Sequence, residues 1–242
     1  MNSRWLEQSK AVFLKELRTE WRSKHGLFVG GLFVLLATVA MGFATMFDRQ
    51  RPSPDLAAGM LVVTMLFAGA IVIPRIYLAE EDQGTFELLR LIAEPGPAYL
   101  GKLFYALLQM VLVALVSCII FNEMVQVPVT QPIFLYGAAS IFALALGGGL
   151  SFTSSLVLGA ANRWMLASAV GIPLLMPVVI LGIICIRYGY GMGRWNETLQ
   201  ALVGLGGLSL ACVAIGPALA PWVWGLAVNQ KRVPEPENRT QP

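Results

Sequence analysis

Six long apolar runs determine most of what this chain can fold into. A helix needs about 20 predominantly apolar residues to cross the hydrocarbon core of a bilayer. Only α-helices and closed β-barrels span a bilayer. No run alternates strictly between apolar and polar residues, as a barrel strand would, so helices are expected. The sequence therefore predicts an all-α integral membrane protein with six transmembrane helices, at 26–47, 56–79, 99–121, 132–161, 165–186 and 199–228.

The composition supports a membrane protein and argues against several kinds of function. The chain is 57% apolar and 13% charged, whereas soluble domains carry about 25% charged residues. Its net charge of +3 is small, so no nucleic-acid partner is predicted. The three cysteines lie inside apolar runs without a CxxC or CxxCH pattern, which argues against a metal site and against covalently bound haem.

No catalytic set is evident, and we expect that the chain is not an enzyme. It has a single histidine and no carboxylate pair within a span, which leaves little from which to build an acid–base dyad or a metal site. The segment GPAYLGKL at 96–103 resembles a phosphate-binding loop, but Leu103 stands where that motif needs Ser or Thr. We therefore predict no nucleotide-binding site and interpret Lys102 as a snorkelling lysine at the entrance to the third span.

The distribution of positive charge predicts the orientation of the chain. Positively charged residues concentrate in the cytoplasmic segments of membrane proteins. With the N-terminus inside, the outer segments hold four of the 17 Lys and Arg residues, namely Arg49, Arg51, Arg187 and Arg194. Six spans then place both the N-terminus and the C-terminus in the cytoplasm, and the lipid bilayer is the expected environment.

Three regions are expected along the chain. Residues 1–25 carry aromatic and leucine residues at helical spacing among many cations, which is typical of an amphipathic helix on the membrane surface. That helix is either a plain anchor or a functional element. Residues 26–228 form the six-span domain. The polar, proline-containing tail at 229–242 is predicted to be disordered.

The stretch EEDQGTFELLRL at 80–91 follows the second span and is unusually charged. Gly84 is expected to end the preceding helix, and Thr85 is a suitable N-cap for a short helix over 86–92 that ends before Pro95. Such a helix presents apolar and charged residues together and can dock in the groove of a partner protein. The alternative is a solvated loop between two spans.

Arg75, near the end of the second span, is a candidate functional charge within the membrane. Charged residues inside a span are costly and are often functional. We expect that Arg75 either reaches the cytoplasmic face or pairs with Glu80 or Asp82.

The chain resembles a known family at three segments: KELRTEWRSK near the start, EDQGTFELL after the second span and GAANRWMLAS before the fifth. With the predicted topology, these segments are similar to those of permease subunits of type-2 ABC exporters. The resemblance is greatest to the haem exporter B subunit of cytochrome c maturation, the CcmB family. The turn ANRW has fewer basic residues than that family's pattern.

This resemblance implies a membrane subunit without ATPase activity of its own. A separate ABC ATPase subunit would use ATP, and a second copy of the chain would complete the pathway. Haem is the candidate cargo, haem-handling membrane proteins are candidate partners, and the bacterial inner membrane is the implied location. The elbow helix at the membrane surface would include Lys15, Glu16, Leu17 and Arg18. The ATPase-coupling helix between spans two and three would include Glu81, Asp82, Gly84, Thr85, Glu87, Leu88 and Arg90.

Two other functions remain open at this point. A type-2 ABC permease for a lipid, a polysaccharide or a drug would have the same topology. A non-transporting membrane assembly scaffold would have no ATPase partner, and changes in the loop at 80–92 would then have no effect on transport.

Overall fold

A computed structural model describes residues 3–23, 25–48, 51–82, 84–85, 93–157, 171, 173 and 175–231. Helices account for nearly all of these residues, and no strand occurs among them. The helices are α1 (Ser3–Ser23), α2 (His25–Asp48), α3 (Pro54–Asp82), α5 (Pro95–Val125), α6 (Pro132–Leu156), α8 (Met176–Gly189) and α9 (Trp195–Lys231).

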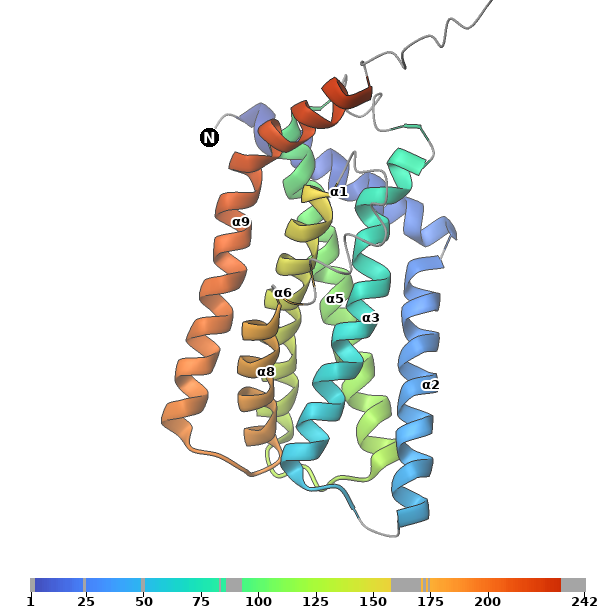
Figure 1. Ribbon diagram of the computed structural model, residues 1–242, viewed down its shortest axis with the longest axis vertical. Helices are drawn as coiled ribbons and strands as arrows, with labels where there is room; N and C mark the ends of the chain where they lie inside the picture. Colours follow the sequence, from blue (N-terminus) through green and yellow to red (C-terminus); the bar gives the residue numbers. More distant parts are fainter. Residues whose placement is uncertain are drawn as a thin grey trace, which may run out of the picture.

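The helices form an elongated bundle with a distinct structure at each end (Figure 1). Helix α1 lies across one end, and α2, α3, α5, α6 and α9 run along the length of the bundle, with the shorter α8 beside α6. We call the end that carries α1 the elbow end. The last turns of α9 lie at the same end. The other end, called the far end, carries the turns between α5 and α6 and between α8 and α9.

Proline marks the start of several helices. Pro54, Pro95 and Pro132 are the first residues of α3, α5 and α6. Proline suits this position because its fixed φ is helical and its missing N–H would have no partner within the helix. The turn residues of the sequence therefore determine where these long apolar segments begin.

Burial differs strongly among the long helices. In the most apolar 18-residue stretch of each helix, 61% of the residues are buried in α3 and 56% in both α5 and α6, compared with 22% in α2 and 11% in α9. The first three helices form the centre of the bundle. Helices α2 and α9 leave most of their apolar side chains exposed, which is the pattern expected for helices that face lipid.

The predicted all-α membrane architecture is confirmed by the helices, whereas the number of spans is not. Among the described residues, five helices are long and apolar enough to cross a membrane: α2, α3, α5, α6 and α9. The predicted span at 165–186 is represented by α8, which has 14 residues, and residues 158–170 lie outside the described part of the chain. The six-span topology and the cytoplasmic position of both termini therefore stay predictions.

Several boundaries also differ from the sequence-based ones. Helix α6 ends at Leu156, before the predicted limit of 161, and α9 continues to Lys231, beyond the predicted limit of 228. Hydropathy does not register where the backbone leaves the helical conformation, so differences of a few residues are expected. The rest of the predicted tail lies outside the described residues.

Candidate functional site

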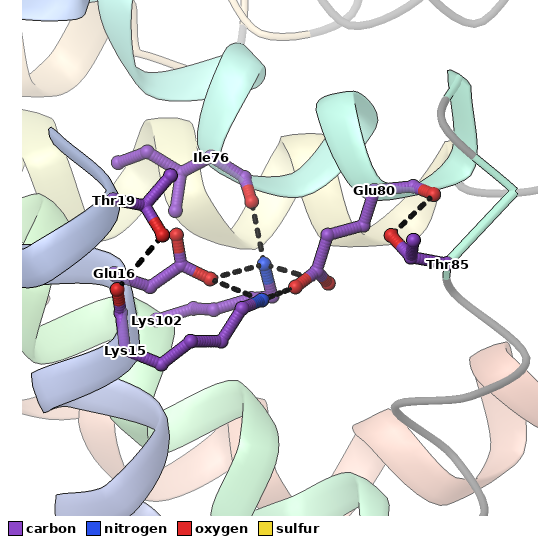
Figure 2. A network of polar contacts seen from close by, with 7 residues as sticks. All are labelled: Lys15, Glu16, Thr19, Ile76, Glu80, Thr85 and Lys102. Carbon is purple, nitrogen blue, oxygen red and sulfur yellow. Dashed lines mark hydrogen bonds and ion pairs between the residues drawn. The ribbon is translucent and has the colours of Figure 1, made fainter. Parts of the chain in front are cut away.

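Four charged side chains from three helices meet at the elbow end (Figure 2). Lys15 and Glu16 come from α1, Glu80 comes from the last turn of α3, and Lys102 comes from α5. We call these residues the charge cluster. Two ammonium groups and two carboxylates balance each other, so the four groups together carry no net charge when all are ionised.

Lys102 is the centre of the charge cluster and is 1% exposed. Its Nζ donates to Glu16 Oε1 at 3.0 Å and to the carbonyl oxygen of Ile76 at 2.6 Å. Nζ also lies 2.9 Å from Glu80 Oε2, as an ion pair without hydrogen-bond geometry. It sits 5.7 Å from the centre of the Tyr77 ring. A buried ammonium is tolerated only when it is paired and hydrogen-bonded in this way.

Lys15 connects the charge cluster to the protein surface. Its ammonium contacts Glu80 Oε1 and lies 3.3 Å from Glu16 Oε1, while 47% of its side chain is exposed. Burial lowers the pKa of Lys15, and the neighbouring Glu16 carboxylate opposes that shift. Each carboxylate of the cluster therefore contacts both lysines, which ties α1 to α3 and to α5.

A glycine allows α1 to approach α5 closely enough for these contacts. A methyl group on Gly101 would lie 2.6 Å from the carbonyl oxygen of Ser9 and 2.7 Å from Cβ of Val12. Both distances are shorter than real contacts allow, and the Ser9 atom belongs to the backbone of α1. The residue next to Lys102 is therefore small because two helix backbones pass each other at this point.

The chain leaves α3 through a turn that depends on Glu80. Gly84 adopts a φ of +70°, which is the left-handed conformation that favours glycine. The backbone N–H of Thr85 donates to the carbonyl oxygen of Glu80 at 2.9 Å, and Thr85 Oγ1 donates to the same oxygen at 3.2 Å. This glycine-terminated turn is a common way to end a helix. The carboxylate of Glu80 thus contacts Lys15 and Lys102, and its carbonyl oxygen accepts hydrogen bonds from Thr85 at the start of the next segment.

The structure locates some of the predicted site residues and not others. Lys15 and Glu16 belong to the charge cluster, whereas Leu17 and Arg18 are exposed on α1. The prediction that Gly84 ends the helix is confirmed. Thr85 bonds back to α3, and the short helix that it was expected to cap lies outside the described residues. The coupling residues Glu87, Leu88 and Arg90 also lie outside them, as do the side chains of Glu81 and Asp82.

One interpretation from the sequence needs correction: Lys102 does not snorkel to the surface, because it is buried and bound by two carboxylates. For Arg75, which is half-buried, one of the expected partners is removed, because Glu80 pairs with Lys15 and Lys102. The side chain of Asp82 lies outside the described residues, so a position at the cytoplasmic face or a pair with Asp82 stays a prediction for Arg75. A signal for the correction at Lys102 was present: Tyr99, Tyr105 and Ala106 lie three or four positions from Lys102, so its helix face is apolar.

The described residues contain no group of three or more His, Cys, Asp or Glu side chains that could hold a metal ion. The charge cluster pairs cations with anions and has no histidine. Its chemistry suits a structural connection between helices better than proton transfer or nucleophilic attack, since each charged group is occupied by an opposite charge.

Comparison with known proteins identifies a family and a relative of this chain. A sequence model of the family described as "CcmB protein" matches residues 7–224, from the first turns of α1 into the last part of α9. Heme exporter protein B of Paracoccus denitrificans (strain Pd 1222) is 25% identical over 217 residues, which make up 87% of this chain and 95% of that protein.

Proposed function

The chain belongs to the CcmB protein family, and from this premise we propose that it is the transmembrane permease subunit of an ABC exporter. The cargo pathway would serve haem export or delivery for the maturation of c-type cytochromes. The name of the relative from Paracoccus denitrificans supports haem as the cargo. In this proposal the protein has six spans with both termini in the cytoplasm, and it resides in the bacterial inner membrane.

ATP would be bound and hydrolysed by a separate ATPase subunit. This chain would hydrolyse nothing and would convert the movement of its partner into movement of its own helices. A second copy of the chain would form the other half of the pathway, and haem-handling membrane proteins would take part on either side of the transport step.

The observation that carries the coupling mechanism is the double role of Glu80. Its carbonyl oxygen accepts a hydrogen bond from Thr85, in the proposed coupling segment at 80–92, and its carboxylate contacts Lys15 of α1 and Lys102 of α5. A displacement of the coupling segment by the ATPase would therefore reach α3 at a residue that is already fixed to two other helices. We infer that α1, α3 and α5 move together as one unit.

The elbow helix supports the same mechanism. Lys15 and Glu16 point into the charge cluster, while Leu17 and Arg18 are exposed on α1. The exposed Arg18 is available to the ATPase, and the cluster residues connect that face of α1 to the bundle. The coupling segment and the elbow would thus act on the same three helices.

A deletion strain tests the proposal. Without the gene, covalent haem staining of c-type cytochromes should be lost while b-type cytochromes remain normal. The intact gene should restore the staining, and a Glu87→Arg copy should not. Glu123→Arg is the matched control, because Glu123 is exposed near the far end of α5 and lies outside the proposed coupling surface.

Co-purification of the ATPase separates the remaining alternatives. Normal c-type staining in the deletion strain would contradict the haem assignment, and an ATPase that still co-purifies would point to a type-2 permease with a lipid, polysaccharide or drug as cargo. If no ATPase co-purifies with the wild-type chain, the protein is a membrane assembly scaffold and the transport proposal is wrong.

A further inference from the structure

A second feature of the elbow end is a groove bounded by α1, the start of α2 and α5. Its volume is about 510 Å³. Leu17 of α1, Leu27 of α2 and Leu108 and Leu112 of α5 form an apolar wall, and these four side chains are 37–43% exposed. A groove of this kind, at the level of a helix predicted to lie on the membrane surface, can accept an acyl chain from the surrounding lipid.

One part of the groove is polar and lacks partners. Tyr105 and Gln109, which line it from α5, are 4% and 2% exposed. Within the described part of the chain, neither the Tyr105 hydroxyl nor Gln109 Oε1 has a hydrogen-bond partner. Buried polar atoms are nearly always satisfied, and an unsatisfied one costs about 1–3 kcal/mol. These two atoms indicate a ligand that offers a hydrogen-bond donor to the amide oxygen and an acceptor to the hydroxyl group.

A carboxylate lies beside these two groups. Glu20 lines the groove from α1, and its Oε1 accepts a hydrogen bond from the backbone N–H of Leu27 at 2.9 Å. A methyl group on Gly26 would lie 2.9 Å from Gln109 Nε2 and 3.2 Å from either carboxylate oxygen of Glu20. The amide and the carboxylate therefore converge over the same glycine.

The charge of the groove limits what it can bind. Of the lining residues that the structure describes, none is Lys or Arg, and Glu20 is the one that carries a charge. An anionic head group would be repelled by this carboxylate, whereas an ammonium group would be attracted and could donate to both Glu20 and Gln109.

We propose that this groove binds one phospholipid whose head group carries a primary ammonium, as in phosphatidylethanolamine. The ammonium group donates to the Glu20 carboxylate and to Gln109 Oε1, a phosphate oxygen accepts from the Tyr105 hydroxyl, and an acyl chain follows the leucine wall. The proposal requires a protein that lies in a bilayer and does not depend on the cargo or on the ATPase.

A neighbouring groove shows why the assignment is specific to this one. It has a volume of about 480 Å³, lies along the other part of α1 and shares Leu108. Its polar groups are accounted for: Ser9 Oγ donates to the carbonyl oxygen of Trp5 at 3.1 Å, and Lys10 is exposed. Without a buried unsatisfied atom it gives no comparable indication of a ligand.

The test is native mass spectrometry of the purified full chain in non-ionic detergent. The chain is titrated with phosphatidylethanolamine, phosphatidylcholine and phosphatidylglycerol that have identical acyl chains. Phosphatidylcholine has the same net charge as phosphatidylethanolamine, but its trimethylated nitrogen has no N–H to donate. We expect one phosphatidylethanolamine to bind about tenfold more tightly than either of the other lipids, because a charge-assisted hydrogen bond is lost with each of them.

Two variants locate the preference at the proposed residues. Glu20→Gln keeps an oxygen for the Leu27 N–H but removes the charge, and it should reduce the preference for phosphatidylethanolamine over phosphatidylcholine to about twofold or less. Gln109→Met removes the amide acceptor and should also reduce the preference. Glu7→Gln, an exposed position on the same helix, should leave it unchanged.

The proposal is overturned if phosphatidylcholine binds as tightly as phosphatidylethanolamine, or if phosphatidylglycerol binds more tightly than both. It is also overturned if both groove variants retain the wild-type preference. If one variant does not yield folded protein, the other decides the result, since the two substitutions alter different helices.

Discussion

The two ends of the bundle use charge in different ways. At the elbow end, Lys102 has a side chain that is 1% exposed, and its partners Glu16 and Glu80 are 11% and 9% exposed. At the far end, Arg187 is 29% exposed, and its partners Glu197 and Asp55 are 48% and 55% exposed. The far-end distances, 3.1 Å and 3.8 Å, are no shorter than those around Lys102.

The far end instead relies on aromatic packing. Phe134 of α6 lies against Tyr188 of α8 and Trp195 of α9, with ring centres 4.9 Å and 6.0 Å apart, and the ion pairs of Arg187 lie at the surface. Aromatic rings commonly occupy the boundary between membrane and water. Ion pairs of similar length are therefore expected to contribute differently to the free energy of unfolding, because the cost of breaking a pair depends on how deeply the remaining charge is buried.

The largest effect is expected from Lys102→Met. The change leaves Glu16 and Glu80 with Lys15 alone and removes the link from α1 and α3 to α5. We expect the free energy of unfolding to fall by up to about 5 kcal/mol, because breaking a buried pair leaves an uncompensated charge. Unfolding by increasing SDS in mixed micelles measures this loss, and Lys10→Met on the exposed face of α1 is the control. Equal stability of the two variants would show that the charge cluster is not structural.

A smaller loss is expected from Glu80→Gln. The amide keeps the shape of the side chain, Lys102 retains Glu16, and the half-exposed Lys15 can turn toward solvent. We expect a loss of about 3 kcal/mol in the same unfolding experiment. Glu94→Gln is the matched control, because that carboxylate is exposed and makes no capping hydrogen bond to α5. A loss larger than that of Lys102→Met would place the centre of the cluster at Glu80 instead.

Gly101→Ala tests the close approach of α1 and α5 without changing any charge. The added methyl group meets the backbone of α1, which cannot move aside as a side chain can. Overpacking of this kind costs about 1–3 kcal/mol. Gly206→Ala in α9 is the control, since nothing lies within 4 Å of its added methyl group. Unchanged stability of Gly101→Ala would mean that the elbow end tolerates a wider spacing between these helices.

The smallest effect is expected at the far end. Arg187→Gln removes exposed ion pairs, and such pairs contribute about 0–1 kcal/mol. A double-mutant cycle with Glu197→Gln measures their coupling, which we expect to decrease further as salt is added. A coupling above about 2 kcal/mol would remove the distinction between the two ends.

Sequence reasoning predicted the helices well and the site only in part. The apolar runs located five long helices, and Gly84 correctly marked the end of α3. Among the elbow residues, Lys15 and Glu16 belong to the charge cluster, whereas their role toward an ATPase stays a prediction. Lys102 was misinterpreted because a positive charge at the start of a span usually reaches the membrane surface. The partners that keep it buried come from two other helices.

The sequence by itself determined that this chain is a helical membrane protein, because the length of an apolar run and the position of proline and glycine are local properties. It also carried the family resemblance in short segments. Only the tertiary structure decided which helices are central, which charges are buried and which side chains with unsatisfied polar atoms line a groove. Glu16 and Lys102 lie far apart in the chain, and whether a charge is neutralised depends on atoms that other helices bring to it. Hydropathy describes a residue's affinity for lipid, whereas burial and pairing depend on its neighbours in three dimensions.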